Sequence, residues 1–173
     1  MIFELIGTFM AGLVTGLFVF GIRRLAPNFI PKWLIPVGAG AAMLVATISS
    51  EYGWFGRTTA TMPEGFVVAQ SIEEAVFYRP WTYLAPLTSR FVAVDTNSVR
   101  TNESLPDQRI VDLYFYGRWA AINTVPILFD CASERTATLI QDVEFNEDGS
   151  VSDADWSPMA SDDPVFVAAC TAG

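Results

Sequence analysis

Histidine is absent from the 173-residue chain, and lysine occurs once, at Lys32. Without histidine the chain excludes Ser-His-Asp and Cys-His catalysis, histidine metal sites and histidine ligation of haem or chlorophyll. Ten basic residues against 19 acidic ones give a net charge of −9, which argues against nucleic-acid binding. The sequence has no GxSxG motif, no glycine-rich phosphate loop and no CxxC pair, so we expect no catalytic, cofactor-binding or metal site.

Charged residues are scarce, at 17% of the chain against about 25% in soluble domains. Two stretches, residues 5–22 and 33–50, hold 18 residues each without a charge. Eighteen helical residues cover about 27 Å, close to the thickness of a bilayer core. We therefore predict a transmembrane helical hairpin over residues 1–55. Two buried soluble helices would show a polar stripe, and a cleaved signal peptide would begin with positive charge instead of Glu4.

The predicted loop between the helices, residues 23–32, is positively charged. It contains Arg23, Arg24 and Lys32 and no acidic residue. Positive loops stay in the cytoplasm, so we expect the N-terminus and everything after residue 51 on the other side. In a bacterium this means a two-pass protein of the inner membrane with a periplasmic C-terminal domain. Three aromatic residues flank the second helix as an interfacial belt would, namely Trp33, Tyr52 and Trp54.

Both predicted helices carry small residues that allow close packing. Gly12 and Gly16 form a GxxxG pattern, and Gly38, Gly40 and Ala42 open the second helix. Helices in lipid associate through such positions. The pattern is equally compatible with docking onto another membrane protein and with packing of the two helices on each other.

The chain changes character after residue 55. Residues 56–173 contain seven arginines and 17 acidic residues, and residues 56–64 look like a polar linker. Alternation and turn signals predict a small, mainly antiparallel β domain over residues 65–173. The predicted strands are 64–69, 90–95, 111–119, 122–130, 136–145 and 165–170. Ser71 followed by Glu74 predicts a helix over residues 71–77.

The two cysteines, Cys131 and Cys170, both lie in this domain. Two thiols in an exported domain usually form a disulfide, and the alternative is two separate buried thiols.

Three segments could carry a binding function. Residues 144–155 partly match a calcium loop but lack its first Asp and its final Glu, so a solvated acidic hairpin is favoured. Two aromatic segments, residues 77–86 and 114–119, could be docking surfaces or could cover the core. Strand alternation places Tyr114 and Tyr116 on one face and Phe115 on the other.

Three runs of the second half, FVAVDTNSV (91–99), FDCASER (129–135) and DWSPMASDDPVFVAAC (155–170), together resemble the bacterial surface-adhesin E-like domain. The resemblance implies a compact β domain on the outer side of the membrane, a bond between Cys131 and Cys170, and no enzymatic activity.

These observations predict a non-catalytic accessory subunit of an inner-membrane protein complex, with respiratory or photosynthetic electron transport as the expected host. Its expected partners are that complex, the lipid bilayer and a basic soluble electron carrier attracted by the acidic domain. The alternative is a free-standing membrane-anchored binding module of the cell envelope, and a third hypothesis is a transient assembly factor.

Overall fold

The computed structural model describes residues 2–139, 151 and 155–172. The chain divides into two compact units, Met1–Arg57 and Thr58–Gly173.

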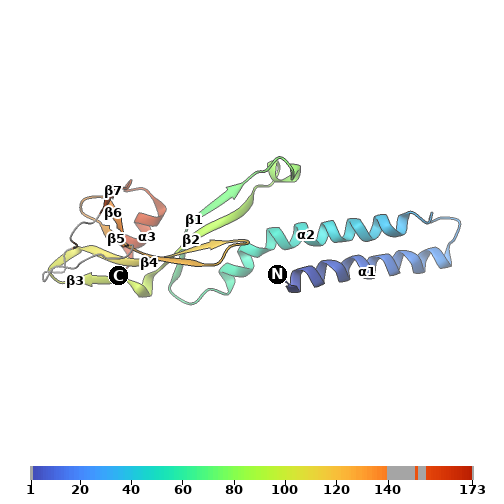
Figure 1. The fold of residues 1–173 in the computed structure, drawn as a ribbon, viewed down its shortest axis with the longest axis horizontal. Helices are drawn as coiled ribbons and strands as arrows, with labels where there is room; N and C mark the ends of the chain where they lie inside the picture. The colour runs from blue at the N-terminus through green and yellow to red at the C-terminus, as the bar shows by residue number, and fades with distance from the viewer. Residues whose placement is uncertain (1, 140–150, 152–154, 173) are drawn as a thin grey trace. The chain divides into compact units, whose positions relative to one another are not determined.

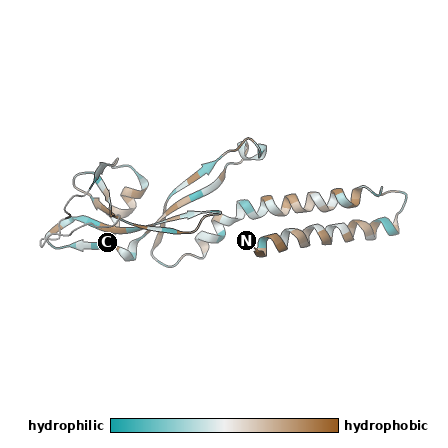
Figure 2. Ribbon diagram, viewed as in Figure 1, coloured by the Kyte–Doolittle hydropathy of each residue, from teal (hydrophilic) through white to brown (hydrophobic). Residues whose placement is uncertain are grey.

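The first unit is built from two long helices, α1 (Ile2–Leu25) and α2 (Leu34–Ala60), which run antiparallel (Figure 1). At 1.5 Å per residue they are about 36 and 40 Å long. Both are long and apolar enough to cross a membrane, and Figure 2 shows hydrophobic residues along most of their length. Pro36 lies in the first turn of α2, where its missing N–H would have no helical acceptor.

Three of the glycines pack between the two helices. A Cβ atom at Gly12 would lie 2.7 Å from Cγ of Met43, so only glycine fits there without displacing that side chain. A Cβ at Gly16 would meet Ala39 at 3.6 Å, and one at Gly38 would meet Val19 at 3.3 Å. The large apolar side chains of α1 instead point outward, including Phe3, Phe9, Leu17 and Phe18.

Polar groups join α1 and α2 at the end opposite their connecting loop. Ser50 donates a hydrogen bond of 2.9 Å from its hydroxyl to Oε1 of Glu4. The guanidinium of Arg57 lies 3.8 Å from the same carboxylate oxygen and donates a 3.0 Å hydrogen bond to the carbonyl of Ser50. The single carboxylate in α1 therefore has partners on α2.

The second unit is an antiparallel sheet. Within the described residues, seven strands take part, and the main order is β1-β2-β4-β5-β6-β7. The strands are β1 (Phe66–Glu74), β2 (Leu87–Asp95), β3 (Arg100–Asn102), β4 (Leu105–Gly117), β5 (Asn123–Asp130), β6 (Arg135–Thr138) and β7 (Trp156–Pro158). β2 pairs with the second half of β4, and β3 pairs with its first half. Short 3₁₀ helices lie at Pro80–Tyr83 and Thr96–Ser98.

A short helix, α3 (Pro164–Thr171), covers one face of this sheet and completes the core (Figure 1). The buried core side chains come from β2, β4, β5 and α3, and they are Val92, Val94, Val111, Leu113, Phe129, Val165, Phe166 and Ala169. The other face carries an aromatic cluster in which Phe91 stacks on Tyr116 at 4.7 Å. Burial, and to a smaller extent the neighbouring Tyr114, raise the pKa of Tyr116.

The helix predicted over residues 71–77 is wrong. These residues belong mostly to β1, where Ser71 is opposite Phe91 and Ile72 is opposite Arg90. The Ser71 and Glu74 spacing is a local helix signal, but pairing with β2 satisfies the same backbone groups over a longer stretch.

The strand predicted over residues 165–170 is also wrong, because these residues form α3. Asp163 accepts hydrogen bonds from the amides of Val165 and Phe166 and so caps the helix, and Pro164 occupies its first position. An N-capping Asp followed by Pro is a helix-start signal.

The strands predicted at 90–95, 111–119 and 122–130 are confirmed as β2, β4 and β5, but not all of their bounds are. β2 begins at Leu87 and β4 at Leu105, three and six residues before the predicted starts, and β4 ends at Gly117 instead of residue 119. The strand predicted over 136–145 is confirmed as β6 up to Thr138, and its residues from 140 onward lie outside the described residues. α2 continues through Ala60, so residues 56–60 of the expected linker are helical.

Candidate functional site

The β domain contains a groove of about 420 Å³ between two of its strand connections. The β1–β2 connection contributes Tyr78 and Arg79, and the β4–β5 connection contributes Arg118 and Trp119. Arg90 of β2 lies between them, because its register partner on β4 is Gly117, the residue before Arg118. The pairing of β2 with β1 and with β4 thus gathers these three arginines at one groove.

The β1–β2 connection is held in a defined conformation by Thr82, which is almost fully buried. Its hydroxyl accepts a 3.0 Å hydrogen bond from the amide of Val76 and lies 2.7 Å from the carbonyl of Arg79, to which it donates. The Pro80–Tyr83 turn closes above it, and the amides of Leu84 and Ala85 both donate to the carbonyl of Trp81. The connection is therefore a structured cap on the hairpin.

The groove is positively charged within an acidic unit. Arg79, Arg90 and Arg118 line it against one carboxylate, Glu74, which lies 3.4 Å from Arg90. Residues 58–173 as a whole contain six arginines and 17 acidic residues, a net charge of −11. Half of the arginines of this unit thus gather at one groove.

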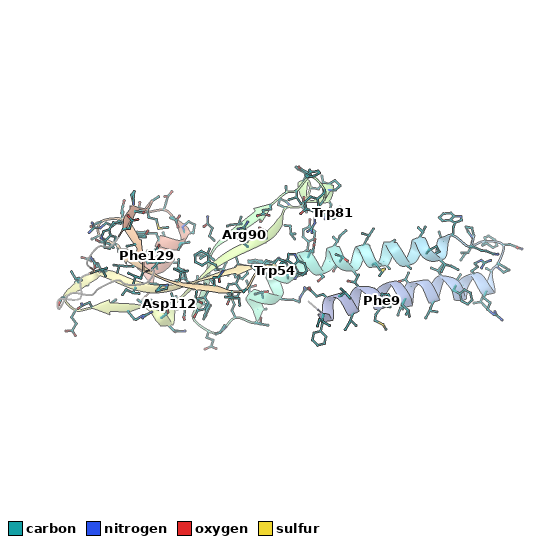
Figure 3. The ribbon with its side chains drawn as sticks, in the orientation of Figure 1. Phe9, Trp54, Trp81, Arg90, Asp112 and Phe129 are labelled. Carbon is teal, nitrogen blue, oxygen red and sulfur yellow. A yellow bond between two sulfur atoms is a disulfide. The ribbon has the colours of Figure 1, made fainter. Side chains whose placement is uncertain are left out.

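Aromatic rings accompany these arginines. The guanidinium of Arg118 lies 4.7 Å from the ring centre of Trp119, and that of Arg79 lies 5.4 Å from the ring centre of Tyr78. Both are cation–π contacts. Figure 3 shows Arg90 along the β1–β2 hairpin and Trp81 at its end.

Large apolar side chains of the same two connections point into solvent. Phe77 is 85% exposed and Leu84 is 92% exposed, and Trp119 is more than half exposed. We call the exposed residues of the two connections the tip surface, and they are Phe77, Tyr78, Tyr83, Leu84, Trp119 and Ile122. Tyr78 and Trp119 also line the groove, so the two connections meet there.

No protein-family model, curated protein or solved structure matches this chain. None of these comparisons therefore tests the resemblance to the surface-adhesin E-like domain.

Metal-binding side chains do not gather in the described part of the chain, where no group of three or more His, Cys, Asp or Glu residues could hold an ion. Most of the candidate calcium loop, residues 144–155, lies outside the described residues. Asp163 of the acidic pair at 162–163 has a structural role as the cap of α3.

Cys131 and Cys170 form a disulfide with a Cα–Cα distance of 5.9 Å. The bond joins the end of β5 to the last turn of α3. Arg109 of β4 strengthens the same junction, because its guanidinium donates hydrogen bonds of 2.8 and 2.6 Å to the carbonyls of Cys170 and Ala172. These carbonyls lie at the helix C-terminus, where a cation is favourable.

Asp130, next to the disulfide, is a buried carboxylate. Arg135 donates two hydrogen bonds of 2.9 and 2.8 Å to its Oδ2, and the amide of Ser133 donates to Oδ1. Burial alone would raise the pKa of Asp130, but the hydrogen bonds and charge of Arg135, together with Ser133, outweigh it and hold the pKa below its ordinary value. Arg135 also stacks over Trp156 at 4.4 Å.

The residues predicted to orient and anchor the hairpin lie around its connecting loop and in the second half of α2. Arg23 and Arg24 are in the last turn of α1, and Lys32 is in the loop before α2. Trp33, beside Lys32, is 62% exposed, and Tyr52 is also exposed, whereas Trp54 is only 6% exposed.

The small residues of α2 do not share one environment. Gly38 faces α1, as described above, whereas a Cβ at Gly40 would have no neighbour within 4 Å, and Ala42 is half-buried. Packing of the two helices on each other therefore accounts for Gly12, Gly16 and Gly38, and leaves Gly40 open.

Sequence patterns do not point to the groove arginines. The aromatic segments that flank the groove are visible as runs, but Arg79, Arg90 and Arg118 come together only through the pairing of β2 with β1 and with β4. The predicted alternation, with Tyr114 and Tyr116 on one strand face and Phe115 on the other, agrees with their burial, since both tyrosines are half-buried and Phe115 is exposed.

Proposed function

We propose that this chain is a non-catalytic accessory subunit of a bacterial inner-membrane protein complex. Its hairpin spans the membrane with the loop of Arg23, Arg24 and Lys32 in the cytoplasm, and its β domain lies in the periplasm. The two long apolar helices, the positive loop and the disulfide support this arrangement. The subunit stabilises its host through its helices and its periplasmic cap.

The open position of Gly40 carries this proposal. Gly40 lies about 200° around the helix from Gly38, so it is on the face turned away from α1. Val37 and Leu44, one turn away on either side, are exposed. A helix of another subunit can approach α2 closely at a glycine without a neighbour.

Electron transport is the host that we favour, because the acidic periplasmic domain would attract a basic soluble electron carrier. A net charge of −11 on this unit accelerates encounter with a basic partner at low salt. Raising the salt concentration should slow that association.

The groove of the β domain favours an alternative function. A free-standing membrane-anchored binding module, similar to the surface-adhesin E-like proteins, would hold an anionic ligand between Arg79, Arg90 and Arg118. An assembly factor would bind the same host as an accessory subunit, but only transiently.

Purification of the tagged full chain from its native membrane in mild detergent, followed by mass spectrometry, tests the proposal. We expect a large cofactor-bearing complex in constant stoichiometry. Gly40→Ile should abolish its recovery, because the added side chain blocks close approach. Val45→Ile is the control and should leave recovery unchanged, since Val45 of α2 is exposed but already carries a β-branched side chain.

A chain that purifies alone, or only with itself, would refute the accessory-subunit proposal and favour the binding module. Recovery of the host only during its synthesis, and not in the finished complex, would favour the assembly factor.

A further inference from the structure

We propose that the tip surface docks onto the membrane, with its apolar side chains among the lipid headgroups and acyl chains and the groove arginines on lipid phosphates. The ligand is the surface of a bilayer that contains anionic lipid. This inference goes beyond the proposed function: it needs the membrane anchor but no host complex.

The residue types of the tip surface suit a bilayer interface. Tyr78, Tyr83 and Trp119 have rings with a polar atom, the kind of side chain that gathers at the level of the headgroups. Phe77 and Leu84 have no polar atom and are the most exposed of the set. They can enter the acyl boundary, as the apolar residues of interfacial anchors do.

The charges make this face, and not the rest of the domain, compatible with an anionic membrane. Arg79, Arg90 and Arg118 line the groove beside the tip surface, with Glu74 as the one carboxylate in the lining. One guanidinium group can donate two hydrogen bonds to the oxygens of a phosphate. The guanidinium groups of Arg79 and Arg118 also lie next to aromatic rings. The excess of acidic residues on the rest of the domain repels anionic lipid, so charge favours the orientation in which the groove arginines face the membrane.

The exposed side chains are held in place before any contact with lipid. The hydrogen bonds of Thr82 to Val76 and Arg79 fix the turn that carries Tyr83 and Leu84. A rigid loop loses little conformational entropy when it inserts, which favours binding.

Chain length keeps the domain within reach of the bilayer. α2 ends at Ala60 and β1 begins at Phe66, so the connecting segment is residues 61–65. Five residues extend over at most about 17 Å. A domain on so short a tether stays near the membrane surface that α2 leaves, and even weak docking is then populated.

The test uses the full chain in lipid nanodiscs. Leu84→Cys is labelled with a fluorophore, which is specific because Cys131 and Cys170 are bonded to each other. Quenching by nitroxide-labelled lipid and by aqueous iodide is compared in phosphatidylcholine and in an equal mixture with phosphatidylglycerol. Glu103→Cys, in the β3–β4 turn at the far end of the sheet (Figure 1), is the control, and Leu13→Cys on α1 reports insertion of the hairpin.

We expect lipid quenching at position 84, with an iodide quenching constant at least about threefold lower than at position 103. The effect should be stronger with phosphatidylglycerol, and Arg79→Gln with Arg118→Gln should remove that increase. Equal iodide quenching at 84 and 103 would overturn the proposal, as would shielding at 84 without lipid quenching. Lipid quenching at position 13 shows that the hairpin is inserted, and positions 84 and 103 are compared in nanodiscs that meet this condition.

Discussion

The carboxylate of Asp130 combines burial with three hydrogen bonds, so it is a residue whose loss should be felt throughout the β domain. Asp130→Asn leaves Arg135 without its anionic partner. We expect it to lower the free energy of unfolding by about 2 kcal/mol at neutral pH, the size of hydrogen bonds to a charged group. Denaturant titration of the full chain in detergent measures this loss.

The same pair predicts how stability depends on pH. Because the pKa of Asp130 is lowered by folding, its contribution is fully present above about pH 4, the ordinary range of a carboxyl. The contribution disappears as the pH falls through the lowered pKa of the folded state. The difference between wild type and Asp130→Asn should therefore shrink in acid. Asp107→Asn, at an exposed aspartate, is the control. If it lowered the free energy of unfolding as much as Asp130→Asn does, the prediction would be contradicted.

Gly12 leads to a prediction about the helical hairpin. Gly12→Ala would place its methyl group 2.7 Å from Cγ and 2.9 Å from Sδ of Met43. Overpacking of this kind costs about 1–3 kcal/mol, partly offset by the better helix propensity of alanine. We expect lower thermal stability of the helical circular dichroism signal in detergent.

Two variants separate the clash from other effects of Gly12→Ala. Gly40→Ala gains the same propensity without a neighbour, so it should be neutral or stabilising. Met43→Ala makes room for the methyl group, so adding Gly12→Ala to it should cost less than in the wild type. An equal cost in both backgrounds would show that Met43 is not the cause.

Some of these features can be predicted from residue types alone, and others cannot. Two cysteines in one segment that is expected to be exported predict a disulfide, which is present between Cys131 and Cys170. The partners of Asp130 and the gathering of Arg79, Arg90 and Arg118 depend on register and turns, which single residues do not encode.

At the scale of elements, the sequence predicted the long helices and the central strands because their patterns are long. It misassigned residues 71–77 and 165–170, where short patterns compete. The pairing of β1 with β2 outweighs the N-cap signal of Ser71. The apolar run of α3 is typical of a strand, and its helix signal, Asp163–Pro164, lies at the edge of that run.

The attachment of α3 gives a prediction at this scale. The disulfide closes a separation of 39 residues, which stabilises the fold by about 3–4 kcal/mol in the loop-entropy model. Replacing Cys131 and Cys170 by alanine should lower the free energy of unfolding by that amount. Hydrogen exchange in α3 should also accelerate, since only the hydrogen bonds of Arg109 and the core contacts then hold its C-terminus, without a covalent bond.

Reductant provides the matched control for the disulfide. Dithiothreitol should lower the stability of the wild type to that of the Cys131→Ala, Cys170→Ala chain and leave the double variant unchanged. If reduction of the wild type leaves the β domain equally stable, the strand and helix contacts suffice without the bond.

At the scale of the whole molecule, charge is divided along the sequence. The loop between α1 and α2 carries Arg23, Arg24 and Lys32, whereas the unit from Thr58 onward carries a net charge of −11. By the positive-inside rule, we expect the positive residues near the helix ends to set the orientation of the hairpin and the acidic residues to contribute little. The same sequence thus contains an orientation signal and, separately, a surface suited to basic partners.

Orientation in the membrane is the last prediction. A reporter that is active only in the periplasm should be active when fused after the β domain, and a reporter that fluoresces only in the cytoplasm should do so when inserted at Asn28, between the helices. Replacing Arg23, Arg24 and Lys32 by glutamine removes the positive loop and should produce mixed orientations, because no short cytoplasmic segment then carries the bias. Arg57→Gln, at the other end of α2, should leave the orientation unchanged. Periplasmic activity of a reporter at Asn28 in the wild type would reverse the proposed topology and move the disulfide-bonded domain to the cytoplasm, where thiols are kept reduced.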